Sequence, residues 1–386
     1  RSNGVVPASA ERGVSHAVHK RTVMEENSMK KILCLVLALA MMSLALVACG
    51  GTTSTPASTP ASQPASQPAS MADSEPAETF DPVDLRVAYM PNMGSCSLLA
   101  TAINAGFFEE MGLNVTLTEF QGGPAEIAAM ASGDIDISQI GHGAHALCIE
   151  GQAKIFQLDC TSLADAVMAN KDKGISTVAD LKGKTVAATA GTSAEIILNL
   201  ALAEAGLTQS DVKVVEMDAN GMVSAMVSGS VDACATWSPS TMTIANALGD
   251  KAITLATNND FVDKVTFPSS FITTDKFATE NHDVLVRFSR ALQKAQDYRA
   301  ANIEEVAKWV AKQCKAEEQT MLDCVGEGNW LTGEFIAKGL ADGTVKTYYE
   351  NQQQVFIDAG RITEKVPVED YVLFDVMEEA AAANAK

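Results

Sequence analysis

The chain has 386 residues, 47% of them hydrophobic, and a formal net charge of −20 at pH 7. This length is sufficient for two lobes, each with its own hydrophobic core. The negative charge excludes nucleic acids and anionic membrane surfaces as natural partners, so we expect no nucleic-acid binding.

The first predicted element is a secretory signal peptide over residues 29–48. Lys30 and Lys31 precede an apolar run that ends at Val47 and is followed by a small residue. The run is slightly short for a membrane-spanning helix, which needs about 20 apolar residues. Residues 1–28 are mixed and polar, and we interpret them as an upstream extension outside the fold.

A lipid anchor and a tether are predicted next, over residues 49–83. Cys49 directly follows Leu-Val-Ala, which resembles the bacterial lipobox, in which the cysteine is lipidated and becomes the first residue of the mature protein. From Ser54 to Ala69 a four-residue Ser/Thr/Gln-Pro-Ala pattern repeats. Such a segment has no apolar surface to bury and is predicted to be disordered. The expected location is therefore extracytoplasmic, with a lipid anchor in the bacterial cell membrane.

The folded part begins near residue 84 with alternating strand and helix patterns. Apolar runs predict strands at 85–89, 113–120, 135–140 and 154–158, and helical spacing predicts helices at 97–110, 124–132 and 144–150. Alternation on this scale predicts parallel sheets covered by helices on both faces.

A second, similar series follows, and then a helical end. The second series has predicted strands at 185–190, 212–217, 231–236, 252–256 and 271–273, and helices at 193–205, 221–228 and 240–248. The end has predicted helices at 281–302, 303–313, 316–326, 333–341, 345–359 and 371–383. The heptapeptides MASGDID (130–136) and MVSGSVD (226–232) occupy the same place in the two series, which predicts two related lobes.

Six cysteines lie beyond the signal and the lipobox: Cys96, Cys148, Cys160, Cys234, Cys314 and Cys324. Secretion permits disulfides, but the spacing determines no pairing. The first four lie among apolar or small residues, where buried free thiols are expected. Only Cys314 and Cys324 are candidates for a local bridge. Without a CxxC pair or a Cys/His cluster at zinc spacing, no metal site is expected.

Four segments in a fixed order carry a family resemblance. They are LRVAYMPNMGSCSLLATAINAGFFEEMGLNVTLTEFQGG, MASGDIDISQIGHGA, VADLKGKTVAATAGTSAEIILNLALAEAGLTQSDVKVVEM and MVSAMVSGSVDACATWSPS. Together they resemble the extracytoplasmic substrate-binding proteins of ABC importers. More narrowly, they are similar to the aliphatic sulfonate, nitrate and taurine group, which includes binders of thiamine pyrimidine precursors. The resemblance covers residues 85–277 well and the helical end loosely.

The resemblance implies an α/β fold like that of periplasmic binding proteins. Two lobes, each a mostly parallel sheet flanked by helices, would be joined by two hinge crossings, with the ligand cleft between them. We expect residues 84–164 and 275–386 in the first lobe and 165–274 in the second. The implied function is capture of a small anionic or polar organic solute (sulfonate-, taurine- or nitrate-like) for delivery to an ABC permease and its ATPase. The alternative solute is a thiamine pyrimidine precursor or a similar heterocycle.

The candidate ligand-binding residues lie in loops after strands, because open α/β units bind ligands outside the carboxyl ends of their strands. Between a predicted strand and helix of the second series, N–H groups and hydroxyls can bind an anionic or polar head group; a simple N-cap is the alternative. An indole after another strand can pack against an organic ligand or plug the surface of the lobe. In the first series, ordinary turn chemistry is the alternative for every loop. The candidates are Asn92, Met93, Gly94, Ser95, Gln121, Gly122, His142, Gly143, Gly191, Thr192, Ser193, Trp237 and Ser238.

Catalysis has little support in the sequence. There is no G-x-S-x-G elbow, P-loop or H-E-x-x-H motif. Pyridoxal-phosphate-dependent pyrimidine synthases share the implied fold, but their cysteine-rich motif is not matched and an extracytoplasmic location does not suit them. We therefore predict a binding protein with no cofactor. No Arg occurs among the candidates, so an anion would be held by N–H groups and hydroxyls, with His142 as a further contact.

Overall fold

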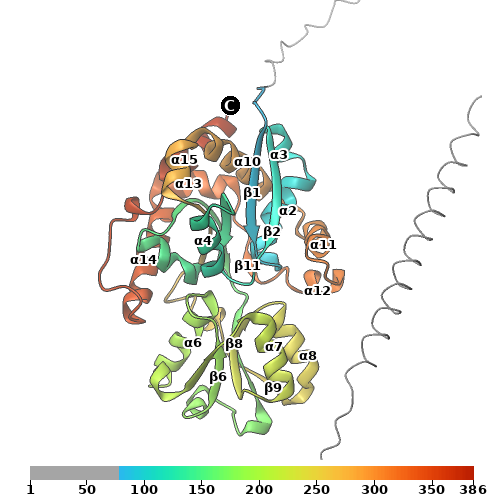
Figure 1. Cartoon of the computed structure of the whole chain (residues 1–386), viewed down its shortest axis with the longest axis vertical. Coiled ribbons are helices and arrows are strands. Elements are labelled where there is room, and N and C mark those ends of the chain that lie inside the picture. The colour runs from blue at the N-terminus through green and yellow to red at the C-terminus, as the bar shows by residue number, and fades with distance from the viewer. Residues whose placement is uncertain (1–77) are drawn as a thin grey trace, which may run out of the picture. The chain divides into compact units, whose positions relative to one another are not determined.

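The structure is a computed structural model that describes residues 78–386. The upstream extension, the signal peptide, Cys49 and the tether up to residue 77 lie outside the described residues. Within the described part, no helix combines the length and the apolar character needed to cross a membrane. The first described residues and the C-terminus both lie at the end of the first lobe that is remote from the second (Figure 1).

The first lobe is built on a six-stranded sheet with the order β11-β4-β10-β3-β1-β2 (Figure 1). Its strands are β1 (Val83–Tyr89), β2 (Leu113–Glu119), β3 (Ile137–Ile140), β4 (Lys154–Ser162), β10 (Pro268–Thr273) and β11 (Gly328–Asn329). The flanking helices are α2 (Met93–Asn104), α3 (Phe107–Glu110), α4 (Gly123–Ser132), η1 (His142–Ala144), α5 (His145–Ile149), α9 (Asp275–Glu280), α10 (His282–Ala301), α11 (Ile303–Cys314), α12 (Glu318–Asp323), α13 (Gly333–Asp342), α14 (Thr344–Asp358) and α15 (Phe374–Asn384).

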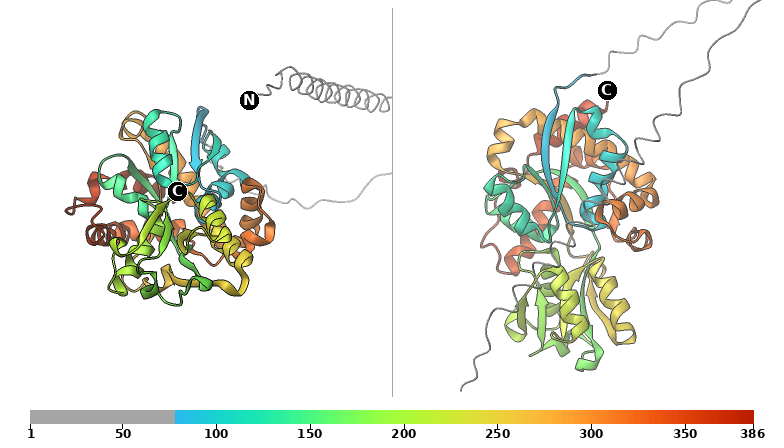
Figure 2. Two further views of the ribbon diagram at one scale, coloured as in Figure 1. Left: turned by 60° about the horizontal axis from the view of Figure 1, so that its bottom comes forward. Right: turned by 45° about the vertical axis from the view of Figure 1, so that its right-hand side comes forward.

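The second lobe is built on a five-stranded sheet with the order β7-β6-β8-β5-β9. Its strands are β5 (Asp165–Asn170), β6 (Thr185–Ala188), β7 (Lys213–Glu216), β8 (Ala233–Trp237) and β9 (Ala252–Thr257). Its helices are α6 (Ser193–Glu204), α7 (Ala219–Ser228) and α8 (Ser240–Leu248). Alternate residues of β5 belong to different apolar clusters, because α6 covers one face of the sheet while α7 and α8 cover the other (Figure 2).

The chain crosses between the lobes twice, and each crossing inserts an antiparallel strand. β4 leads into β5, and β9 leads back into β10. β5 runs antiparallel to β8 and β9, and β10 runs antiparallel to β3 and β4. A strand that enters a lobe from the cleft runs antiparallel to the strands whose carboxyl ends lie at the cleft. Both sheets are therefore mixed, but most strands of each sheet run in one direction, so the prediction of mostly parallel sheets is confirmed.

Three predictions need correction. β10 was assigned to the second lobe, but it is hydrogen-bonded into the first sheet, so the return crossing precedes Pro268 rather than residue 275. β5 was not predicted. The end of the chain is not wholly helical, because the short strand β11 pairs with β4.

The final aspartates of the two repeated heptapeptides form equivalent hydrogen bonds in the two lobes. Asp136 accepts a hydrogen bond from the backbone N of Arg86, and Asp232 accepts one from the backbone N of Thr185, each at 2.9 Å. Both aspartates also exchange backbone hydrogen bonds with the same partners. In this way each lobe joins the start of one strand to the start of its parallel neighbour, β1 to β3 and β6 to β8. The two lobes are thus related at their ends remote from the cleft.

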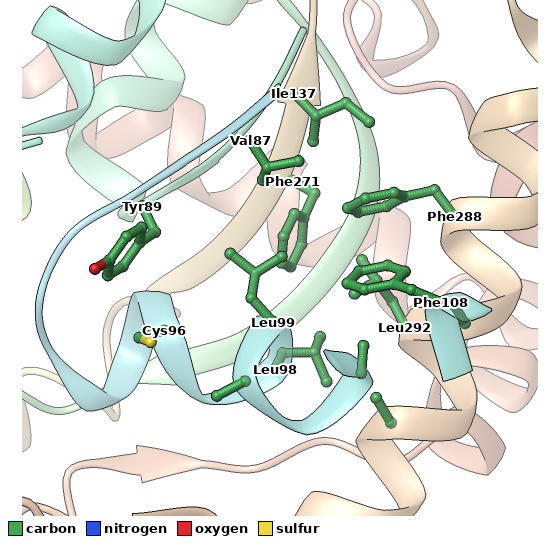
Figure 3. Packing of buried hydrophobic residues seen from close by; sticks show 14 of the residues in the cluster. Val87, Tyr89, Cys96, Leu98, Leu99, Phe108, Ile137, Phe271, Phe288 and Leu292 are labelled. Carbon is green, nitrogen blue, oxygen red and sulfur yellow. The ribbon is translucent and has the colours of Figure 1, made fainter. Parts of the chain in front are cut away.

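Aromatic and aliphatic side chains form the core of the first lobe between β1, α2 and α10 (Figure 3). Phe288 of α10 lies at the centre, with its ring centroid 4.7 Å from that of Phe108 and 6.0 Å from that of Phe271. Burial of apolar area at roughly 25 cal/mol per Å² is the main stabilisation of such a layer. It secures the loop between β1 and α2, which forms one wall of the cleft.

The six cysteines in the described part are all free thiols. Cys314 and Cys324, the candidate pair, are not bridged. The Cys324 thiol instead lies 3.5 Å from the Met242 sulfur of the second lobe. Cys96, Cys148, Cys160 and Cys234 are buried, in keeping with their apolar surroundings.

Candidate functional site

A cavity lies between the lobes, where the starts of α2, α4 and α6 meet the ends of β1, β3 and β8. Its volume is about 50 Å³, counted as positions that the centre of a water molecule can take. Seven of the predicted residues line it: Asn92, Gly94, Ser95, Gly191, Thr192, Ser193 and Trp237. They come from both lobes, so the loops after the strands converge as the sequence suggested.

Two predicted residues belong elsewhere. The Met93 side chain is buried in the core of the first lobe, because the first turn of α2 directs it toward that core and not toward the cavity. The Ser238 hydroxyl hydrogen-bonds to Thr241 and Glu327. The contact between Ser238 and Glu327 joins the second lobe to the helical end of the chain, so Ser238 supports the interface between the lobes.

Gln121 and Gly122 lie beside the cavity without lining it. The Gln121 side chain is half-buried and accepts a hydrogen bond from Asn220 of α7 at 3.3 Å, which connects the two lobes at the rim. A Cβ atom on Gly122 would be 3.9 Å from the Thr192 side chain. Both residues therefore contact the opposite lobe rather than the enclosed space.

His142 and Gly143 are also interface residues. The His142 side chain is buried, and its Nε2 lies 3.3 Å from an Asp165 carboxylate oxygen across the cleft. A Cβ atom on Gly143 would lie 2.1 Å from the backbone carbonyl atoms of Thr192. Only glycine permits this approach of η1 to the start of α6. In this conformation His142 faces Asp165 and not a solute.

Hydrogen bonds between residues close in sequence hold the start of α2. Asn92 is the N-cap, and its side chain accepts a hydrogen bond from the Ser95 backbone N at 2.8 Å. The Ser95 hydroxyl accepts one from the Met90 backbone N at 2.9 Å. Capping satisfies N–H groups that a helix start otherwise leaves unpaired. This wall of the cavity is therefore held rigidly by residues within five positions of each other.

The start of α6 is organised differently. No side chain caps it at Thr192, whose hydroxyl donates instead to the Thr189 carbonyl at 2.7 Å. The Gly191 backbone N donates to Glu195 at 2.7 Å, and the Ser193 hydroxyl donates to Asp165. The three donors that the sequence assigned to a ligand head group thus have partners within the protein. The other N–H groups of the first turn remain the donors that a solute can use.

Asp165 is the most informative residue that sequence reasoning missed. It is the first residue of β5, its side chain is 1% exposed, and it lines the cavity. Besides Ser193 and His142, the Asn258 amide donates to it at 3.1 Å. An acidic residue at the start of an apolar run, next to a hinge, was the available signal. The other lining residues that are not among the candidates are Met90, Gly123, Gln139, Gly141, Ala144, Ser162, Ala164 and Ser269.

Contacts between the lobes hold the cavity in its present form. Arg361, which follows α14, lies 2.7 Å from Glu195 of α6, and both side chains are largely buried. Next to this ion pair, Ile196 of α6 packs against Phe356 of α14 in a small apolar cluster. The pair and the cluster connect the start of α6 to the helical end of the first lobe.

The cavity lining offers hydrogen-bond acceptors, such as the Asp165 carboxylate, but no cationic side chain. No Lys or Arg lines it, and among the described residues no group of three His, Cys, Asp or Glu side chains could hold a metal ion. A second carboxyl group, Glu126 in the first turn of α4, is fully buried with one donor, the Ser138 hydroxyl. Burial raises the pKa of Glu126 to about 8, so this carboxyl is protonated at neutral pH.

Comparison with known proteins gives matches over most of the described chain. The model of the NMT1/THI5-like family matches residues 95–306, more than half of the chain. A Brucella abortus (strain 2308) protein, named only as a binding protein, is 33% identical over 76% of this chain and 92% of its own length. A Bacillus subtilis protein named for binding aliphatic sulfonates is 29% identical over 55% of this chain and 65% of its own. The taurine-binding periplasmic protein of Escherichia coli is 26% identical over 70% and 80%.

Solved structures have the same fold. The alkanesulfonate-binding protein of Xanthomonas axonopodis pv. citri, bound to MOPS, has a TM-score of 0.59 at 21% identity, over 76% of this chain and 99% of its own. The nitrate-binding protein of Synechocystis PCC 6803 has a TM-score of 0.63 at 14% identity, over 78% and 89%. A desulfurization enzyme has a TM-score of 0.55 at 15% identity, over 79% and 99%. The described chain therefore has the periplasmic-binding-protein fold, which carries both binding proteins and an enzyme.

Proposed function

This chain belongs to the NMT1/THI5-like family, and from that premise we propose that it is the extracytoplasmic solute-binding component of an ABC importer. The observation that carries the proposal is the small cavity lined by residues of both lobes. A solute that contacts two lobes stabilises their closed arrangement, and the closed form is what a permease can distinguish from the empty protein. The permease and its ATPase are the partners that this role requires.

The solute is a small anionic or polar organic molecule of the sulfonate, taurine or nitrate kind. The names of the relatives support this class, and so does the size of the cavity. An anionic group would bind at the start of α6, where N–H groups of the first turn and the positive end of the helix dipole are available. A thiamine pyrimidine precursor has less support, because none of these relatives is named for it.

A binding role is favoured over catalysis. The named relatives are binding proteins, whereas the desulfurization enzyme matches at a level of identity that indicates fold alone. Glu126 of α4 is a buried acid with a raised pKa, but it does not line the cavity. A titratable group outside the cavity gives no reason to assign a reaction.

The anchor is Cys49, and the residues after it are the tether between membrane and domain. The lipobox-like sequence before Cys49 supports this part of the proposal. The tether ends before residue 83, where it was predicted to end, because Phe80 packs on the core of the first lobe and β1 begins at Val83. Metabolic labelling with a fatty acid should mark the wild-type chain, while Cys49→Ala should be unlabelled and recovered in the soluble fraction. An unlabelled wild type would contradict the anchor and leave the binding role untouched.

The binding role is tested on the mature chain carrying Cys49→Ala, in solution. Isothermal titration calorimetry with taurine, ethanesulfonate and nitrate should give saturable binding of at least one solute. Small-angle X-ray scattering should then show a decrease in radius of gyration on binding. A folded protein that binds none of a wider panel of sulfonates, oxyanions and small heterocycles would contradict the proposed function.

A further inference from the structure

Gln139 presents an unused acceptor at the cavity wall. The residue is in β3, is 1% exposed and lines the cavity. Its side-chain nitrogen donates to Asp159 at 2.9 Å and lies 3.4 Å from the Gly94 carbonyl, while its oxygen Oε1 has no hydrogen-bond partner. A buried acceptor without a partner is unusual in a folded protein, and a bound solute is one way to satisfy it.

The orientation of this amide is determined by its surroundings. Asp159 is buried in an ion pair with Arg299 at 2.7 Å, with both side chains fully buried. Turning the Gln139 amide over would place its oxygen against the Asp159 carboxylate, where two acceptors would face each other. Oε1 is therefore the Gln139 side-chain atom that remains free for a solute.

Asp165 offers a second acceptor in the same cavity. Its Oδ2 atom is approached by His142 and Asn258, whereas Oδ1 receives one hydrogen bond, from Ser193. A carboxylate oxygen has two lone pairs, so Oδ1 can accept one more donor. In a cavity of about 50 Å³, one small group of a solute can reach the wall on both sides.

No cation in the lining offsets these acceptors. The nearest guanidinium on the α6 side is that of Arg361, which lies 3.3 Å from the place that a Cβ on Gly191 would take, and its charge is paired with Glu195. A negative group placed beside Asp165 in this desolvated space would be repelled, while a positive or N–H group would be attracted.

We propose that the cavity selects solutes that carry an ammonium or N–H donor, which binds Gln139 Oε1 and Asp165 Oδ1. A zwitterion fits best, because its anionic end can face the N–H groups at the start of α6 while its ammonium faces the acceptors. Simple anions without a donor, such as nitrate and plain alkanesulfonates, are poor solutes for this site. The inference rests on the proposed function and narrows its solute class.

Matched pairs of solutes test this directly by isothermal titration calorimetry on the mature chain carrying Cys49→Ala. The pairs are taurine against ethanesulfonate, 3-aminopropanesulfonate against propanesulfonate, and 4-aminopyrimidine against pyrimidine. We expect the amine to bind at least tenfold more tightly in one pair or more, and nitrate to give no heat of binding. Equal or tighter binding of the amine-free partners, or of nitrate, would overturn the inference while the proposed function stands. No binding by any of these solutes would contradict the inference, and the wider panel described above then decides on the proposed function.

Two variants tie the preference to the named atoms. Asp165→Asn removes the negative charge, and Gln139→Met removes the free acceptor at similar size. Each should reduce the preference for the amine, measured as the ratio of the two affinities within a pair, at least tenfold. Asp263→Asn, on an exposed side chain of the second lobe, is the matched control and should change nothing. Melting temperatures identify any variant that fails to fold, and a folded Asp165→Asn that keeps the full preference would overturn the inference.

Discussion

The starts of α2 and α6 face the same cavity from opposite lobes, yet different kinds of hydrogen bonds hold them in place. At α2, Asn92 and Ser95 satisfy each other and the adjoining loop through short-range hydrogen bonds. At α6, Thr192 provides no cap, and the Ser193 hydroxyl is held by Asp165, which comes from a different strand. The first wall is determined by local sequence, while the second depends on how the sheet is assembled.

This difference indicates which wall a solute can influence. A locally capped helix keeps its geometry whatever the other lobe does. The start of α6 is joined to Asp165, and through Asp165 to His142 of the opposite lobe. Binding and lobe contact are therefore connected on the α6 side, and the predictions below test that connection in order of expected effect.

The largest effect is expected at α4, a third helix start at the cavity, where the buried Glu126 carboxyl has one donor. Its pKa is about 8 in the fold against 4.5 unperturbed. The unfolded chain therefore releases a proton that the folded chain retains, so stability present below pH 4.5 is lost as the pH rises toward 8. Glu126→Gln should remove this loss, which amounts to at most about 5 kcal/mol at 1.36 kcal/mol per pKa unit.

Urea unfolding of both proteins at pH 5 and pH 8 measures this effect. The wild type should lose stability between the two values and Glu126→Gln should lose much less. Glu109→Gln, on an exposed side chain of α3, is the control and should follow the wild type. A parallel pH dependence of Glu126→Gln and wild type would show that the buried carboxyl is not the cause.

Gly143→Ala should separate the lobes without unfolding either one. The added methyl group would meet the Thr192 backbone at 2.1 Å, and backbone cannot move aside as a side chain can. Overpacking of this kind costs about 1–3 kcal/mol, equivalent to roughly 5- to 150-fold in affinity for a solute that needs lobe contact. Titration with taurine should show the loss of affinity, and small-angle X-ray scattering should show a larger radius of gyration.

Gly326→Ala is the control for this substitution, because a Cβ there meets nothing within 4 Å and its backbone angle does not require glycine. It should bind and scatter like the wild type. If Gly143→Ala closes and binds normally, the contact between η1 and α6 is not needed for closure, and the comparison of the two walls loses its functional meaning.

Ser193→Ala tests the long-range bond of α6. Without the hydroxyl, one buried Asp165 oxygen has no donor, which costs about 1–3 kcal/mol of unfolding free energy. Ser240→Ala, at the same first position of α8, is the matched control and should cost little, because the Ser240 hydroxyl forms no hydrogen bond with the described residues. A more than tenfold loss of affinity without loss of stability would instead restore Ser193 as a direct ligand contact.

Asn92→Ala is expected to have the smallest effect. Removing the α2 cap should lower the unfolding free energy by about 1 kcal/mol, because one helix N–H group loses its acceptor. Asn92→Ser keeps a capping oxygen and should recover most of the loss. Equal stability of the alanine and serine variants would mean that α2 does not depend on this local cap.

Much of the fold could be predicted from the sequence because it is encoded locally. Strand and helix patterns depend on the spacing of apolar residues, and most predicted elements agree with the structure to within a few residues. The two lobes were visible in the repeated heptapeptides, since Asp136 and Asp232 act within one sheet each. Seven predicted site residues line the cavity because loops after strands converge at a cleft in this kind of fold.

Other features had no local signal. The direction of β5 and β10 depends on where the chain re-enters a lobe, and an apolar strand pattern is the same in either direction. Met93 was predicted at the site from its loop, but the first turn of α2 directs its side chain into the core. Arg361 forms an ion pair with Glu195, more than 150 positions away in the sequence, and no sequence motif predicts such a pair.

The sequence by itself determined the order of the elements, the two related lobes, the family and the loops that form the cavity, because these follow from apolar spacing, turn chemistry and short-range hydrogen bonds. The tertiary structure alone decided which polar atoms are still free in the cavity. Whether a side chain such as Ser193 serves a solute or the protein depends on the acceptor brought beside it. That acceptor, Asp165, comes from a strand whose position only the assembled sheet defines.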